Sequence, residues 1–539
     1  MIYQSPFPTP HVPTDLSISQ FLLAQNPDDV PHNKEIISDF DHRAHALSYG
    51  ELRTRAARAA SYLENCMNVR EGDVVCIYGQ NSVNWLLLAH SIFWVGGCAS
   101  LINPAATSYE LQHYFSMAKP KIMAVDAHML PTAREALRES SLAGNVQILI
   151  IEDFTSHADR WKGPVFPKDF VRFHNSSLPP FDLRGRNNKE VPAAMCFSSG
   201  TSGKPKGVVL THYNLIAYLL TVRLTNPNTH SSQTTEVFFP SFAHVYGLIS
   251  AVLLTAYVGC RVRSSEIRST ILRLVPALAI RMTKDPDIKK LNLKSVKAVM
   301  VSGATLASAT VRDLQQLLSS DAAVLNGYGM TEMTLTMLRE TQSHRAGSVG
   351  RPAAGVSIRI ANDDLKDVNP GEVGECLAKG PTLFLQYKDN PEETRSSFTD
   401  DGWFRTGDLL RVDEHGYFWV TGRKKELIKY KGNQVSPAEI EGLLLSHPLV
   451  VEAGVCGIDN GDTELPTGCV VLAPEVKAVD SSNTLKDISK FLEERVAPFK
   501  RLRGGLYQLE SLPKGSTGKL LRRELPAIIS KKLKIQAKI

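Results

Sequence analysis

The chain has 539 residues, of which 43% are hydrophobic and 22% are charged, with 61 Lys and Arg against 55 Asp and Glu. This balance is typical of soluble globular proteins and excludes the disordered and fibrous classes. At about 150 residues per domain, the length also excludes a small module stabilised by disulfides or metals, and it predicts a fold of several lobes.

Eight cysteines are scattered along the chain without a CxxC pair or a His/Cys cluster at zinc-ligand spacing, which predicts buried thiols in a reducing compartment. The N-terminus lacks the positive and apolar regions of a signal peptide. The longest apolar runs, Leu86–Ile102 and Tyr246–Cys260, are too interrupted or too short to cross a bilayer. We therefore expect buried core helices there and no transmembrane segment.

Short β-branched runs alternate with amphipathic helical patterns over most of the chain, which predicts α/β layers around mainly parallel sheets. The first expected helix has a capping box, with Ser48 at its start and Glu51 three residues on. The expected helices are Leu47–Cys66, Asn81–Val95 and Ser108–Ala118. The expected strands are Asp73–Tyr78, Cys98–Ile102, Lys121–Val125, Val146–Ile151, Ala193–Phe197, Val208–Leu210, Val237–Phe239, Ala298–Val301 and Ala323–Asn326.

After about Gly347 the pattern changes to short strands with many glycines and turns, namely Ser357–Ile360, Gly374–Ala378 and Tyr417–Val420. A charged segment then precedes a fresh α/β pattern. The sequence therefore predicts an α/β protein with a large N-terminal body of layered, mainly parallel sheets, a β-rich subdomain and a small α+β cap. We place the body at residues 1–422 and the cap at 423–539.

The positive charge is concentrated at the end of the chain, because residues 514–539 contain eight Lys and Arg and one acid. No aromatic interleaving or recognition-helix pattern accompanies these charges, so we expect no nucleic-acid partner. A polyphosphate substrate or a solvated terminal helix explains them better.

The most informative string is MCFSSGTSGKPKGVVLT, residues 195–211. Glycines and hydroxyl side chains between two apolar strands form a loop rich in hydrogen-bond donors, which can surround a phosphate. It is not a Walker A loop, because Pro205 follows Lys204 where that motif needs Ser or Thr and a helix start. From the residue types alone, a solvated hairpin is the alternative.

This string resembles the phosphate-binding loop of the adenylate-forming superfamily, which includes acyl-CoA and 4-coumarate–CoA ligases, luciferases and peptide-synthetase adenylation domains. Further motifs of that superfamily follow in order: PSFAHVYGL at 240–248, NGYGMTE at 326–332, DGWFRTGDL at 401–409, GRKKELIKYKGNQVSPAEIE at 422–441 and LPKGSTGKLLRREL at 512–525. The resemblance covers residues 45 to 525 and implies a cap that is mobile relative to the body. It also implies that ATP is bound by loop residues Ser198, Ser199, Gly200, Thr201, Ser202, Gly203, Lys204 and Lys206.

The NGYGMTE motif has glycines and a ring, Gly327 and Tyr328, that allow close approach to an adenine. By resemblance, Thr331 contacts a phosphate and Glu332 binds Mg²⁺, for which a carboxylate oxygen is suitable; a Thr-Glu pair alone would indicate only a helix N-terminus.

By the same resemblance, Asp408 holds the ribose hydroxyls and Arg423 assists it. His244, beside aromatic residues, resembles the gate between an acyl pocket and a CoA tunnel; a buried core histidine is the alternative.

The lysine-rich segment after residue 422 would ordinarily be a solvated face. The resemblance makes Lys425 a hinge, Lys429 and Gln434 catalytic contacts for thioester formation, and Lys431 and Gly432 part of the CoA site. It places catalytic Lys519, on a Gly- and Ser-rich loop, between the substrate carboxylate and the α-phosphate, where its charge would stabilise the transition state.

We therefore predict an ATP-dependent carboxylate–CoA ligase that forms an acyl-adenylate and then an acyl-CoA thioester. Its substrates would be ATP, CoA and an aryl, cinnamoyl, medium-chain or natural-product acid, with Mg²⁺ as cofactor. An adenylation domain that loads a carrier protein and a homologue that has lost catalysis are the alternatives. The chain departs from the superfamily at residues 259–276, a segment about a dozen residues short in which at most one helical turn or strand fits, over Ile267–Val275. Gln386 stands where glycine is usual.

The last three residues, Ala537, Lys538 and Ile539, resemble the small–basic–aliphatic pattern of a peroxisomal targeting signal. They imply a peroxisomal import receptor as partner and the peroxisomal matrix as location, with the cytoplasm otherwise. An ordinary frayed terminus is the alternative.

Overall fold

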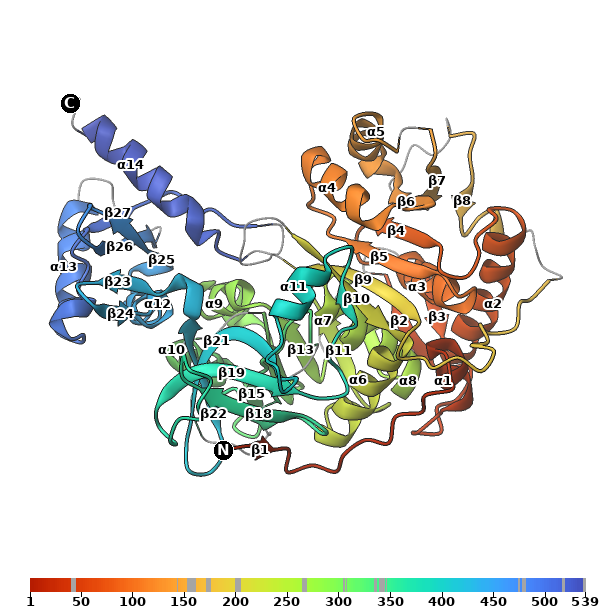
Figure 1. Ribbon diagram of the computed structural model, residues 1–539, viewed down its shortest axis with the longest axis horizontal. Helices are drawn as coiled ribbons and strands as arrows, with labels where there is room; N and C mark the ends of the chain where they lie inside the picture. The colour runs from red at the N-terminus through yellow and green to blue at the C-terminus, as the bar shows by residue number, and fades with distance from the viewer. Residues whose placement is uncertain are drawn as a thin grey trace.

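The computed structural model describes residues 1–539 except 40–44, 143, 153–160, 171–175, 199–204, 264–268, 304–305, 307, 334–336, 339–344, 346, 474–475, 477–480, 516–518 and 537–539. Two large sheets with helices between and outside them form most of the molecule, beside an antiparallel sheet and a smaller C-terminal part (Figure 1). The predicted α/β class is therefore confirmed.

The first large sheet has the order β20-β10-β9-β5-β4-β6-β7-β8. The strands from β9 to β8 run parallel, and β10 and β20 continue the sheet antiparallel. Every strand predicted in this region is present. The strands are β4 Val74–Tyr78, β5 Cys98–Ile102, β6 Ile122–Asp126, β7 Gln147–Ile151, β8 Val165–Phe166, β9 Pro192–Ser198, β10 Lys206–Thr211 and β20 Gln386–Tyr387.

The second large sheet has the order β15-β14-β13-β11-β12-β2-β3, and only β3 is antiparallel to its neighbour. Its strands are β2 Glu35–Ser38, β3 Ala46–Ser48, β11 Thr235–Phe238, β12 Arg261–Arg263, β13 Ile271–Leu274, β14 Ala298–Val301 and β15 Ala323–Asn326. Strands β12 and β13 pair with opposite sides of β11, and only seven residues separate the two strands in the chain. A parallel crossover usually takes a dozen or more residues. The shortened segment thus keeps a short strand, as predicted, and its described residues contain no crossover helix.

Alternation along the strands divides the first sheet into two buried faces. In β6, Ile122 and Ala124 face one hydrophobic cluster while Met123 and Val125 face another, as the two-residue period of a strand requires. Helices cover both faces. The inner helices are α1 Ile18–Ala24, α2 Tyr49–Asn65, α3 Val83–Trp94 and α6 His212–Thr225, and the outer ones are α4 Ser108–Ala118 and α5 Leu130–Arg138.

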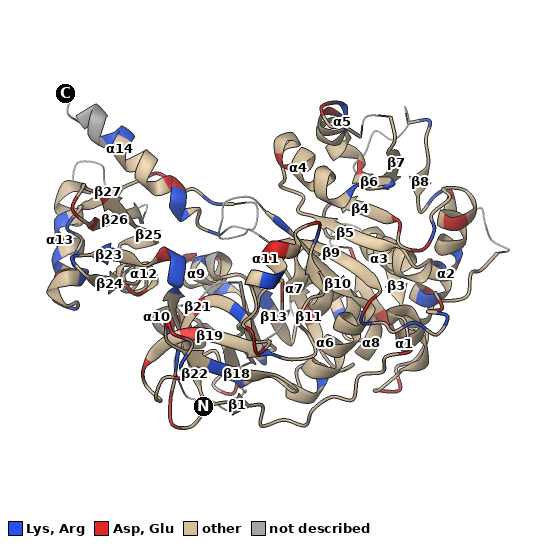
Figure 2. Cartoon of the chain, viewed as in Figure 1, with Lys and Arg blue, Asp and Glu red and all other residues tan. Residues whose placement is uncertain are grey.

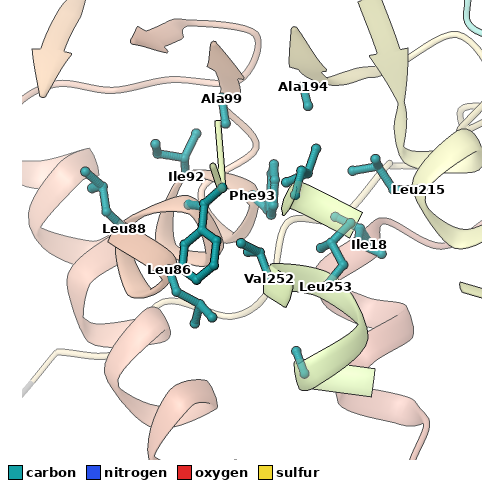
Figure 3. Packing of buried hydrophobic residues seen from close by; sticks show 14 of the residues in the cluster. Ile18, Leu86, Leu88, Ile92, Phe93, Ala99, Ala194, Leu215, Val252 and Leu253 are labelled. Carbon is teal, nitrogen blue, oxygen red and sulfur yellow. The ribbon is translucent and has the colours of Figure 1, made fainter. Parts of the chain in front are cut away.

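The inner helical layer forms the main core, where α3, α6 and the helical run after His244 meet both sheets (Figure 3). That run comprises α7 Val245–Gly247, the π-helix Leu248–Leu253 and α8 Leu254–Val258, all nearly inaccessible to solvent except Tyr246. Ser48 and Glu51 form the predicted capping box of α2. The second sheet is covered on its outer side by α9 Pro276–Lys284 and α10 Ser308–Leu317.

The antiparallel sheet has the order β1-β18-β19-β21-β22 and matches the predicted β-rich subdomain. Its strands are β1 Tyr3–Gln4, β18 Ser357–Ala361, β19 Val373–Lys379, β21 Phe404–Val412 and β22 Phe418–Arg423. The cap has its own sheets, β23-β24 and β25-β26-β27. Its elements are β23 Ile428–Tyr430, β24 Asn433–Val435, α12 Pro437–Leu445, β25 Val450–Asp459, β26 Glu464–Leu472, α13 Ser481–Glu493, β27 Leu506–Gln508 and α14 Leu525–Gln536. The division at residue 422 stays a prediction.

Helices in the described part of the chain are all too short or too polar to cross a membrane. Seven of the eight cysteines are buried as free thiols, whereas Cys66, at the end of α2, is exposed. The expectation of buried thiols is wrong for Cys66, because it follows the last turn of the helix instead of facing the core.

Three buried histidines should make the fold sensitive to mild acid. Burial lowers the pKa of His90 to about 4 and the pKa values of His212 and His230 to about 3, below the unfolded value of about 6.5. As pH falls, the unfolded chain takes up protons before the folded chain does, so the folded state loses stability. Each histidine should lower the free energy of unfolding at pH 5.5 by about 1.4 kcal/mol relative to its value at pH 7.5.

Together these three histidines should contribute a loss of about 4 kcal/mol in the free energy of unfolding, measured by denaturant unfolding at the two pH values. In His212→Asn the amide oxygen can replace Nδ1 as acceptor of the Ile18 N–H, and the pH-dependent loss should shrink by about 1.4 kcal/mol. An unchanged loss in this variant would contradict the assignment.

Candidate functional site

A buried carboxylate, Asp408, lies where the antiparallel sheet meets the loop after β15. Tyr328 donates a hydrogen bond to Asp408 Oδ2 at 2.8 Å, and Arg423 Nε lies 2.9 Å from Oδ1. Asp408 on β21 is directly opposite Arg423 on β22, beside a register shift after Leu409. Burial and the Asp408 charge raise the pKa of Tyr328, which keeps this hydroxyl a donor. The predicted nucleotide residues Tyr328, Asp408 and Arg423 are thus in contact.

A second group of predicted residues surrounds the phosphate loop. Lys206, the first residue of β10, forms an ion pair with Glu393 and lies over the Tyr387 ring, with Nζ 4.8 Å from its centre. Tyr387 donates a hydrogen bond to Glu332 Oε1 at 3.1 Å. The predicted metal ligand therefore shares one cluster with a lysine of the predicted phosphate loop.

Electrostatic contacts connect the two groups. The charge of the Glu332 carboxylate is one of the causes that raise the pKa values of two groups. One is Cys196, on the strand that enters the phosphate loop, and the other is Arg423, beside Asp408. Thr331 is buried next to Glu332. Of the predicted loop residues, only Ser198 and Lys206 can be placed; Ser199, Gly200, Thr201, Ser202, Gly203 and Lys204 lie outside the described residues.

Lys519 of the cap reaches this same region of the body. Burial and the cationic Arg423 lower the pKa of Lys519, while Asp408 opposes them. His244 is also within its influence: burial, followed by the Lys519 charge, lowers the pKa of His244 to about 4. At neutral pH His244 is therefore an uncharged imidazole whose Nδ1 accepts a hydrogen bond from Tyr246 N at 3.1 Å.

The loop that carries Lys519 is fixed at its base. Lys514 and Leu520 form an antiparallel bridge, and Gly515 N donates to Lys519 O at 2.9 Å. Arg522, just after the loop, forms ion pairs with Glu426 and with the buried Glu441 of α12. These contacts hold the lysine loop to the rest of the cap.

Lys429 and Gln434 lie away from that region, on the exposed β23–β24 hairpin. They face each other across the hairpin, whose two turn residues, Lys431 and Gly432, both have positive φ angles, 47° and 78°. Such a turn favours glycine at the second position. The structure therefore brings Lys519 within electrostatic range of Asp408, whereas Lys429, Gln434, Lys431 and Gly432 are exposed on the hairpin. Lys425 lies in the short helical turn Lys424–Glu426 that precedes this hairpin.

Three residues of the site were not predicted from the sequence. Tyr387 contacts the predicted residue Glu332, and Glu393 contacts the predicted residue Lys206. Each pair is far apart in the sequence and is brought together by the fold. Asn326 is 2% exposed, and its side-chain amide has no hydrogen-bond partner among the described residues. Asn326 is the first residue of the NGYGMTE motif, so the motif could have identified it as a residue of the site.

The residues present suit a divalent cation that is held mainly by a nucleotide. The described residues contain no cluster of three His, Cys, Asp or Glu side chains able to hold a metal alone. Glu332 offers one carboxylate beside the phosphate loop, which matches the preference of Mg²⁺ for one or two carboxylates plus phosphate oxygens.

Comparison with known proteins identifies the family of the chain. The AMP-binding enzyme family matches residues 23–388, and the AMP-binding enzyme C-terminal domain matches residues 439–519. The chain is 31% identical to a probable 4-coumarate–CoA ligase 2 of Dictyostelium discoideum, over 87% of this chain and 88% of the relative. It is 30% identical to the peroxisomal OPC-8:0-CoA ligase 1 of Arabidopsis thaliana, over 99% and 96%.

Among solved structures, ATP-bound MatB from Rhodopseudomonas palustris is similar, with a TM-score of 0.80 and 27% identity over 95% of this chain and 99% of the other. The anthranilate–CoA ligase AuaEII has the same fold, with a TM-score of 0.84 at 23% identity over 98% of this chain and 99% of the other. The chain therefore belongs to the AMP-binding enzyme family, as an enzyme of its adenylate-forming acyl-CoA ligase branch.

Proposed function

We propose that this enzyme joins a carboxylic acid to CoA in two steps. The carboxylate first attacks the ATP α-phosphate, which forms an acyl-adenylate and releases pyrophosphate. The CoA thiol then attacks the acyl carbon of the adenylate, which forms the thioester and releases AMP. The observation that carries this proposal is the approach of Lys519 to Asp408, Arg423 and His244. A cation from the cap lies near the predicted nucleotide residues of the body, which suits the first step.

In this proposal the body holds ATP by its two ends. Asp408, fixed by Tyr328 and Arg423, accepts hydrogen bonds from the ribose hydroxyls. The amide of Asn326, which has no hydrogen-bond partner in the part of the chain that the structure describes, offers both a donor and an acceptor to the base. Ser198, Lys206 and Thr331, with the other loop residues Ser199–Lys204, bind the phosphates.

Glu332 would hold Mg²⁺, whose charge would offset that of the phosphates when it is bound. Lys519 would lie between the acid carboxylate and the α-phosphate. Phosphoryl transfer needs position and positive charge more than a covalent nucleophile. Lys519 would reduce the repulsion between the two anions and stabilise the charge that develops in the transition state.

The second step would need another cap position. Lys429 and Gln434 are exposed on the hairpin while Lys519 is at the body. Rotation of residues 423–539 about Lys425 would withdraw Lys519 and bring this hairpin, with Lys431 and Gly432 for CoA, to the adenylate. Uncharged His244 would lie on the route between acid and thiol.

Separate assays of the two steps test the roles of the lysines. Lys519→Ala should slow adenylation, measured as acid-dependent ATP–pyrophosphate exchange, by about 10²–10³-fold because a transition-state contact is lost. It should still convert synthetic acyl-AMP and CoA to thioester. Lys429→Ala should impair thioester formation at least as much as adenylation.

Equal loss of both steps in Lys519→Ala would rule out its assigned role. If a broad panel of acids supports neither pyrophosphate exchange in the wild type nor thioester formation from synthetic acyl-AMPs and CoA, the ligase function itself is wrong. Loading of a phosphopantetheinyl protein instead of free CoA would favour the carrier-protein alternative.

The shortened crossover between β12 and β13 should weaken binding of the acid more than binding of ATP. The crossover joins β12 to β13 of the second sheet, whereas the phosphate loop is on the first sheet and Asp408 is on the antiparallel sheet. The motif that contains Tyr328 and Glu332 begins at the end of β15, two strands away from β13. Calorimetric titration should therefore show tight MgATP binding and weak binding of aryl, cinnamoyl, medium-chain and natural-product acids. Micromolar affinity for any of these acids would refute this expectation.

We also propose import into peroxisomes through Ala537-Lys538-Ile539, which lie outside the described residues. The peroxisomal name of one relative supports this proposal. The helix α14, which leads to these residues, contains Lys531 and Lys532 (Figure 2). An N-terminal fluorescent fusion should collect in peroxisomes, and Lys538→Glu should disperse it. A fusion that stays diffuse with the tripeptide intact would argue against import.

A further inference from the structure

The segment that contains β20 and the helix α11 Pro391–Ser396 contacts both the strand after the phosphate loop and the predicted metal ligand Glu332. Strand β20 pairs antiparallel with β10, the strand that leaves the phosphate loop. Just before it, Phe384 N donates to Glu332 O at 2.8 Å. One segment therefore fixes the backbone at both the phosphate loop and the predicted metal ligand.

Side chains of this segment also contact both Lys206, at the end of the phosphate loop, and Glu332. Tyr387 is almost fully buried, and its hydroxyl donates to Glu332 Oε1 at 3.1 Å. Lys206 Nζ lies 4.8 Å from the centre of the Tyr387 ring and forms an ion pair with Glu393. Glu393 is one of the acidic residues of α11, the helix beside β10 (Figure 2). The tyrosine thus contacts the lysine through its ring and the carboxylate through its hydroxyl.

The backbone also limits how Tyr387 can move. Tyr387 N donates to Thr394 Oγ1 at 3.0 Å, and Asn390 caps α11 by accepting from Glu393 N at 3.1 Å. The Phe384 ring packs 4.8 Å from the Tyr387 ring. These contacts fix the hydroxyl in space, so it can orient the Glu332 side chain.

A carboxylate with one oxygen held by a fixed donor cannot rotate freely. Its other oxygen then points in one direction. The carboxylate has already lost its rotational freedom before a cation binds, so binding does not have to order it. A tyrosine hydroxyl ordinarily carries its proton at neutral pH, so it can donate this hydrogen bond. Partners that orient a metal ligand in this way commonly change metal affinity by about 10–100-fold when removed.

We propose that Tyr387 is a positioning residue for the divalent cation of MgATP: its hydroxyl orients the Glu332 carboxylate, while Lys206, itself paired with Glu393, lies over its ring. This inference rests on the proposed function, since it requires that Glu332 receive the cation. It adds a residue that acts through Glu332 and touches neither the nucleotide nor the acid.

The variant Tyr387→Phe tests this role because it keeps the ring and removes only the hydroxyl. Tyr78→Phe is a matched control: Tyr78 is also buried, and its hydroxyl donates to Ala106 O at 2.8 Å. ATP affinity is measured by calorimetry in EDTA and at stepwise Mg²⁺ concentrations. Tyr387→Phe should need about 10–100-fold more Mg²⁺ for half of the metal-dependent gain in affinity, with unchanged affinity for metal-free ATP. Tyr78→Phe should match the wild type in both.

A double-mutant cycle with Glu332→Gln provides the second measurement. If Tyr387 acts through Glu332, removal of its hydroxyl should not change the Mg²⁺ requirement further in the Glu332→Gln background. Mn²⁺ in place of Mg²⁺ allows the bound ion to be followed by water-proton relaxation, independently of turnover. The Mn²⁺ signal should show the same loss in Tyr387→Phe.

The outcomes separate this inference from the proposed function. A wild type that binds no MgATP overturns both. A wild type that binds MgATP, with an unchanged Mg²⁺ requirement in Tyr387→Phe, overturns only the inference. Equal weakening of metal-free ATP and MgATP, or a much lower melting temperature than that of Tyr78→Phe without a metal-specific effect, identifies a structural brace and also overturns it.

Discussion

The buried carboxylate of Asp408 sets the arrangement of the whole site. A carboxylate removed from water must be paired or hydrogen-bonded, and its partners come from separate parts of the chain. Tyr328 follows the second large sheet, and Arg423 ends the antiparallel sheet. Lys519 comes from the cap, and the Asp408 charge raises its pKa against the opposite effects of burial and Arg423. Satisfying one anion therefore brings three structural units together where the nucleotide is expected.

The same electrostatics explain why one cap position does not serve both lysines. Lys519 lies partly buried among Arg423, Asp408 and Glu426, while Lys429 is exposed on a hairpin on another part of the cap. Arg522 binds Glu426 and Glu441, so the Lys519 loop is tied to the rest of the cap and cannot easily exchange with the hairpin by itself. Use of both lysines at one site would require the cap to move as a unit.

The sequence predicted the strands and helices well because their signals are local. The alternation in β6 and the Ser48–Glu51 capping box each depend on residues only a few positions apart. Contacts between distant segments had no such signal. Tyr387 reaches Glu332 only because β20 pairs with β10, and nothing in the string FLQY indicates that pairing. The motif resemblance predicted Asp408 and Arg423, but not the register shift that sets them opposite each other.

The second sheet shows most clearly what the sequence could not reveal. Glu236 and Arg273 lie on the neighbouring strands β11 and β13, are 0% and 1% exposed, and form two bonds of 2.5 and 2.8 Å. Charged residues in strand-like runs usually indicate a solvated face, so a hydrophobic pattern alone misplaces them. Leaving either charge alone would cost several kcal/mol.

This pair fixes β13 against β11 in the region where the crossover is short. The order of the strands around β11 is thus kept although few residues join β12 to β13. The phosphate loop belongs to the other large sheet, and Asn326 ends β15, two strands away from β13. A change in the crossover can therefore alter its own surroundings while the nucleotide residues keep their geometry.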